Sequence, residues 1–157
     1  MTTIAPEHFT KALLTLLDEA FDNVQGFFLD RNTSLFETLA GVSYEEASIP
    51  VGGKCATLAA QVKHVAFYLD VTYYSVTIPN YPPVDWGEIW RTVKGVTPEE
   101  WLAIQAELRN SYNRIQSLIK EFPAWSSEYE IGGALAVLAH TAYHLGEIRQ
   151  ALCTLKS

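Results

Sequence analysis

Residues 131–155 read IGGALAVLAHTAYHLGEIRQALCTL, and apolar side chains cover most of the circumference of a helix built from them. A helix that is apolar on nearly all sides is buried among other elements. Just before this stretch, Ser127 and Glu130 have the spacing of a capping box, which marks a helix start. We therefore expect a long final helix that is buried in a bundle of other helices.

Prolines and glycines divide the rest of the chain into further helical segments. Apolar residues at helical spacing follow Pro6 as far as Phe28, and Thr97-Pro98-Glu99-Glu100 combines an N-cap threonine with a proline in the first turn. The long helices are expected at 6–28, 54–78, 98–122 and 127–155, with a shorter helical segment at 34–47.

The connection at residues 79–97 is rich in proline and tryptophan, so we expect a long crossover rather than a regular element. Its aromatic residues, Tyr81, Trp86 and Trp90, either cover the core, form an interface or act as a lid. No stretch shows the alternation of a β-strand. The sequence thus predicts an all-α fold. Within this class we expect a single-domain four-helix bundle over residues 1–157, with a long crossover between the second and third long helices.

Composition excludes several classes of function. The 157 residues carry a formal net charge of −7 and no basic cluster, which argues against a nucleic-acid-binding protein. Two widely separated cysteines, Cys55 and Cys153, are too few for a secreted disulfide scaffold, and we interpret them as structural or idle thiols outside the site. No apolar run approaches the roughly 20 residues of a membrane-spanning helix, and the first residues lack the features of a signal peptide. We expect a cytoplasmic protein.

Two of the four histidines, His140 and His144, are four residues apart on the expected final helix. This spacing places them about 40° apart around the helix axis, so both can bind one metal ion. Thr141 stands where the HExxH motif of zinc peptidases has its glutamate, which excludes that mechanism. The alternative is a pair of surface or hydrogen-bonded core histidines, but burial in an apolar helix favours a shared metal.

His64, on the second long helix, is the candidate third ligand. Lys63 and Asp70 mark the expected exposed side of that helix, and His64 lies about 100–120° away from it, toward the interior. The alternative is a core histidine that bonds to a backbone or hydroxyl group, and Tyr68, one turn away, is a candidate partner. Three histidine ligands would leave an open coordination position, as in catalytic sites.

Glu147 follows His144 by three residues and stays on the same side of the helix. It is a candidate fourth ligand, general base or orienting group for an imidazole, and the alternative is an ordinary ion pair with Arg149 or with a neighbouring helix. His8 is expected to be exposed and outside the site.

The chain resembles the DinB family of metal-dependent helical bundles, also called YfiT-like. The resemblance rests on SLFETLAGVSYEEASIPVGGKCATLAAQVKHVAFYL (34–69), VDWGEIW (84–90), VTPEEWLAIQAEL (96–108) and HTAYHLGEI (140–148). It implies a histidine triad at His64, His140 and His144 that holds a divalent metal, and a homodimer. Imidazole ligands suit zinc, nickel, copper or iron, and we expect nickel or zinc. Many relatives have glutamine at the position of Glu147. Characterised relatives include thiol-dependent transferases and isomerases, whereas most have no known activity.

Two classes of function follow. The first is a metal-dependent enzyme, a thiol-dependent transferase or isomerase or a metal-activated hydrolase, which acts on a small-molecule substrate with a low-molecular-weight thiol as a cosubstrate. The second is a non-catalytic helical module that binds a metal or small ligand, for example in a stress response. A di-iron site of the hemerythrin type is disfavoured, because the additional carboxylates and histidines that it needs are missing.

Overall fold

The computed structural model describes residues 4–53 and 55–155, and within them the fold is all-α, with seven helices and no strand. The long helices are α1 (Pro6–Phe21), α4 (Leu58–Thr77), α6 (Pro98–Glu121) and α7 (Glu128–Leu155). The short helices are α2 (Leu35–Leu39), α3 (Tyr44–Ala47) and α5 (Glu88–Thr92). The predicted all-α class is therefore confirmed.

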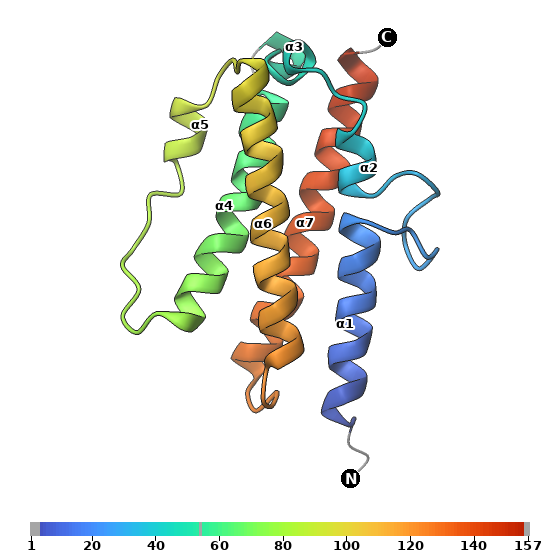
Figure 1. Cartoon of the computed structure of the whole chain (residues 1–157), viewed down its shortest axis with the longest axis vertical. Coiled ribbons are helices and arrows are strands. Elements are labelled where there is room, and N and C mark those ends of the chain that lie inside the picture. Colours follow the sequence, from blue (N-terminus) through green and yellow to red (C-terminus); the bar gives the residue numbers. More distant parts are fainter. Residues whose placement is uncertain (1–3, 54, 156–157) are drawn as a thin grey trace.

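The four long helices pack side by side around an apolar core (Figure 1). Helix α4 packs on α6 and α7, and α1 packs on α7 and α6. The largest fully buried side chains come from every one of these helices and include Leu17, Phe21, Leu69, Tyr112 and Leu145. Burial of such side chains, each contributing about 1.5–3 kcal/mol, stabilises the assembly.

Local signals set the helix starts. In α6 the Thr97 hydroxyl accepts the Glu100 N–H, while the Glu100 carboxylate accepts the Thr97 N–H. Ser127 and Glu130 form the same reciprocal pair before α7. Each pair satisfies backbone donors that a helix N-terminus otherwise leaves free. Both predicted starts are confirmed.

The end of the first helix was predicted wrongly. Apolar spacing predicts helix to Phe28, but α1 ends at Phe21. The buried carboxylate of Glu19 accepts the backbone N–H groups of Phe27, Phe28 and Leu29 at 3.0, 2.8 and 2.7 Å. These N–H groups would otherwise bond within a helix, so Glu19 holds the segment in a loop. Gly26 allows the turn, since its φ of +86° suits glycine.

Two further boundaries differ from the prediction. The segment 34–47 contains two separate short helices, α2 and α3, because a turn at Ala40 and Gly41 interrupts it. Helix α4 begins at Leu58, where the Thr57 hydroxyl accepts the Ala60 N–H. The predicted start at Lys54 lies outside the described residues.

The polar side of α4 faces α6 rather than open solvent. Lys63 and Asp70, expected to be exposed, form ion pairs with Glu107 and Arg114 of α6, each at 2.5 Å. The apolar neighbours of these residues on α4 lie in the core. Residues that mark an exposed face in an isolated helix therefore join two helices here.

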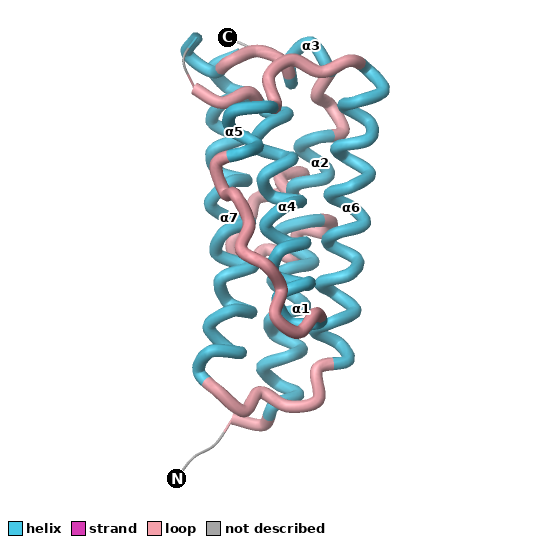
Figure 2. Tube along the Cα trace, turned by 90° about the vertical axis from the view of Figure 1, so that its left-hand side faces the viewer, coloured by secondary structure: helices cyan, strands magenta, loops and turns pink. Residues whose placement is uncertain are grey.

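The crossover runs along the outside of the molecule. Figure 2 shows it passing back over α4 and α7 toward α5. Contrary to the prediction it contains regular structure, the five-residue helix α5. Its end is tied down by the Thr57 hydroxyl, which donates to the Lys94 carbonyl at 3.0 Å, and by the Val96 N–H, which donates to the Ser48 hydroxyl at 2.9 Å. These bonds tie the chain that follows α5 to the N-cap of α4 and the C-cap of α3.

None of the helices in the described part of the chain has both the length and the apolar content needed to cross a membrane.

Candidate metal centre

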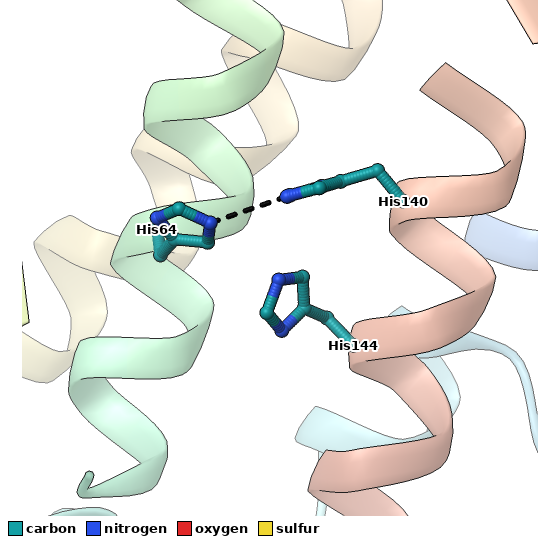
Figure 3. Close-up of side chains that lie close together, drawn as sticks. All are labelled: His64, His140 and His144. Carbon is teal, nitrogen blue, oxygen red and sulfur yellow. Dashed lines mark hydrogen bonds between the residues drawn. The ribbon is translucent and has the colours of Figure 1, made fainter. Parts of the chain in front are cut away.

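Three histidines from two packed helices meet near the middle of the fold. His64 comes from α4, and His140 and His144 come from successive turns of α7 (Figure 3). The Nε2 atoms of His64 and His140 are 3.2 Å apart. One ring nitrogen from each histidine lies within 4.8 Å of the other two. The structure therefore brings together all three residues that the sequence selected as metal ligands.

Burial keeps these imidazoles neutral. His64 and His144 are 9% and 6% exposed, and His140 is partly buried. Desolvation, followed by repulsion from His144, lowers the pKa of His64 to about 4. Desolvation and the two neighbouring imidazoles lower the pKa of His140 to about 3. Desolvation also lowers the pKa of His144, although the nearby Glu147 carboxylate opposes this. Neutral imidazole is the form that binds metal ions.

Two oxygen acceptors lie close to the Nδ1 atom of His144. Its Nδ1 lies 2.9 Å from Glu147 Oε2 and 3.3 Å from Gln61 Oε1, which projects from α4. A nitrogen placed between two oxygens carries the proton, so the lone pair of neutral His144 lies on Nε2. The outer contacts of His144 therefore favour an Nε2 that is free to bind a metal.

Glu147 contacts the outer nitrogen of His144 rather than the space between the three rings. Its other carboxylate oxygen, Oε1, accepts the Tyr143 hydroxyl at 2.7 Å. The expected alternative partner, Arg149, instead donates to Thr38 at 3.4 Å. Of the roles considered for Glu147, this geometry fits the orienting group.

Aromatic rings cover the histidines. Tyr68 stacks on His140, with ring centroids 3.7 Å apart and planes 10° from parallel. Tyr68 is not the hydrogen-bond partner of His64, because Nδ1 of His64 has no partner and its Nε2 faces His140 Nε2. The ring centroid of Trp90, on α5, lies 4.5 Å from that of His64, and the ring centroid of Trp86 lies 6.0 Å from that of Tyr68. Tyr81 instead stacks on Tyr74. The crossover thus supplies one ring directly over the site and a second beside it.

The donor set fits a first-row transition metal. Three neutral imidazoles suit zinc, nickel, copper or iron. Magnesium and calcium prefer carboxylate ligands, and this group of residues contains none. The Nδ1 atoms of His64 and His140 are buried and have no hydrogen-bond partner. Only His144 among the three therefore has the outer acceptor that metal-binding histidines usually have.

The other candidates lie outside this group. His8 is exposed in the first turn of α1, as expected, and Cys55 and Cys153 are exposed free thiols. Thr141 is fully buried. The sequence did not single out Gln61 or Tyr143. Gln61 lies three residues before His64 on the same side of α4, and Tyr143 lies four residues before Glu147, so helical spacing could have indicated both.

No protein-family model matches the chain, and neither does any curated protein or solved structure.

Proposed function

We propose that the chain is a DinB-like divalent-metal-binding protein that acts as a metal-dependent enzyme. In this proposal α1, α4, α6 and α7 are the helices of a single-domain four-helix bundle, and residues 79–97 are its crossover. The mutual packing of these helices and the sequence motifs quoted above support the proposal.

The observation that carries the proposal is the meeting of one ring nitrogen from each of three histidines within 4.8 Å. Three closely spaced imidazoles, of which only His144 has an acidic partner, are costly to protonate together, and one divalent cation would satisfy all three lone pairs. His64, His140 and His144 would be the ligands, with nickel or zinc as the favoured ion. A site with three protein ligands leaves a position for water or substrate.

A divalent ion held by His64, His140 and His144 would lower the pKa of a bound thiol or water molecule, which is the chemistry that it would supply. The remaining tasks belong to the chain. Glu147 and Gln61 orient His144, while Tyr68 and Trp90 limit the access of water to the rings. The reaction class that we propose is transfer or isomerisation with a low-molecular-weight thiol, or hydrolysis.

The metal is tested by elemental analysis of the purified protein after dialysis against nickel or zinc. We expect about one ion per chain in the wild type and less than about a tenth of this in His140→Ala. His8→Ala is the matched control, because His8 is exposed on α1 and outside the cluster. An unchanged metal content in His140→Ala would contradict the proposed ligand set.

The second candidate is a non-catalytic metal- or ligand-binding module, and the ring of Trp90 over His64 favours it, because such a cover restricts substrate access. A metal-loaded assay with small thiols and electrophilic acceptors separates the two. Metal-dependent turnover that falls in Glu147→Gln supports the enzyme. Tight metal binding without turnover over a broad panel supports the module.

The resemblance also leads us to propose a homodimer. Sedimentation at micromolar concentration should then give twice the 17.5 kDa mass of the chain. A species of 17.5 kDa alone would exclude it.

A further inference from the structure

We propose that Glu147, held in place by Tyr143, is a positioning residue that fixes the tautomer and direction of His144. The effect on metal affinity described below rests on the proposed function. The effect on the tautomer concerns the protein without metal and does not depend on the proposed function.

The first argument is the contrast between the three histidines. His144 Nδ1 has Glu147 Oε2 at 2.9 Å, whereas the Nδ1 atoms of His64 and His140 are buried without a partner. A hydrogen bond to a carboxylate is about twice as strong as one between neutral groups. His144 is therefore the one ring of the three whose protonated nitrogen is dictated by a charged acceptor.

The second argument is how the carboxylate itself is fixed. Glu147 is only partly buried, and an unrestrained side chain of this length samples several rotamers. The Tyr143 hydroxyl donates to Oε1 at 2.7 Å, which leaves Oε2 for His144. The Tyr143 ring is 61% exposed and also lies edge-on to the His144 ring at 5.0 Å. Tyr143 thus supports the His144 imidazole in two ways, through its hydrogen bond to Glu147 and through its ring contact.

The third argument concerns what remains when Glu147 is removed. Gln61 Oε1 still faces Nδ1, but at 3.3 Å and without a charge. This longer, neutral contact would favour the same tautomer less strongly. We expect a mixture of the two neutral tautomers of His144, and in one of them Nε2 carries the proton and cannot bind a metal.

The tautomer is measured by side-chain nitrogen NMR of the metal-free protein at neutral pH. In the wild type, His144 Nδ1 should be the protonated nitrogen and Nε2 the unprotonated one. Glu147→Ala should shift both signals toward a mixture. Signals that show a protonated Nε2 in the wild type, or no change in Glu147→Ala, would overturn the proposal.

Metal affinity is measured by competition with a chelator. Loss of an outer partner of a metal-binding histidine costs roughly 10- to 100-fold in affinity, which is the loss expected for Glu147→Ala. Glu147→Gln keeps an acceptor without the charge and should lose less, and Tyr143→Phe should lose less than about tenfold.

Two matched controls separate positioning from general effects. Tyr129→Phe alters an exposed tyrosine of the same helix, and Glu121→Gln removes an exposed carboxylate from α6. Both should bind metal as the wild type does, with unchanged circular dichroism. An affinity of Glu147→Ala within about twofold of wild type contradicts the proposal. If the wild type binds no metal, the proposed function fails, while the tautomer still decides the role of Glu147.

Discussion

Acid should destabilise this protein through its buried histidines well before its carboxylates are protonated. The pKa of His64 is lowered to about 4 and that of His140 to about 3, chiefly by burial, against about 6.5 in an unfolded chain. Between pH 7 and pH 5 the unfolded state therefore takes up protons at these two residues, whereas the folded state does not. Because the unfolded state binds more protons than the folded state, a fall in pH stabilises the unfolded state. The free energy of unfolding therefore decreases.

The size of the effect follows from these pKa values. Over this interval a group that titrates at 6.5 only in the unfolded state costs about 1.9 kcal/mol, so His64 and His140 together cost about 4 kcal/mol. His144 adds to the loss, because its pKa is also lowered. Carboxylates contribute little, since they titrate mainly below pH 5.

Urea denaturation of the metal-free protein at pH 7, 6 and 5 measures this loss. In His140→Asn the contribution of His140 is gone, so the loss should be smaller than in the wild type by about 2 kcal/mol. His8→Asn is the control and should behave as the wild type, because His8 is exposed. A wild-type loss below about 1 kcal/mol, or an equal loss in His140→Asn, would refute the view that burial keeps these imidazoles neutral.

Three further outcomes are expected. Glu19→Gln should lower the free energy of unfolding by about 2–4 kcal/mol and the melting temperature by roughly 10 °C, because an amide cannot accept three backbone N–H groups as a carboxylate does; calorimetry that shows no change would contradict the role of Glu19. Nickel should quench tryptophan fluorescence chiefly at Trp90, so Trp90→Phe should lose most of the quenching while Trp125→Phe, next to Phe122, keeps it. Cys55 and Cys153 should both react with a thiol reagent in the folded protein, and protection of either would disagree with its exposure.

The helix starts could be predicted because their signals are local. The capping pairs Thr97 with Glu100 and Ser127 with Glu130 each lie within one turn, and no distant residue is needed to form them. The end of α1 could not be predicted in this way. The apolar spacing continues past Phe21, but Glu19 binds backbone groups eight to ten residues later and so holds that segment in a loop.

The candidate site shows the same division. The spacing of His140 and His144 follows from helix geometry alone, so their shared face was predictable. The directions of other side chains depend on how α4 and α7 pack. Tyr68 is one turn from His64 in sequence, yet its ring stacks on His140 of the neighbouring helix. Gln61 reaches His144 across the same contact. One helix alone contains no information about such contacts.

The histidines and the ring that covers them belong to parts of the chain with different freedom to change during evolution. The histidines lie on α4 and α7. An insertion or deletion in either helix would also move the side chains that this helix places in the core. Trp90 lies on α5, a five-residue helix within the connection 79–97 that packs chiefly on α4. Surface connections accept insertions and substitutions more readily than packed helices do. Descendants of this chain could exchange the whole connection, and with it the shape above the imidazoles, while inheriting the same three histidines.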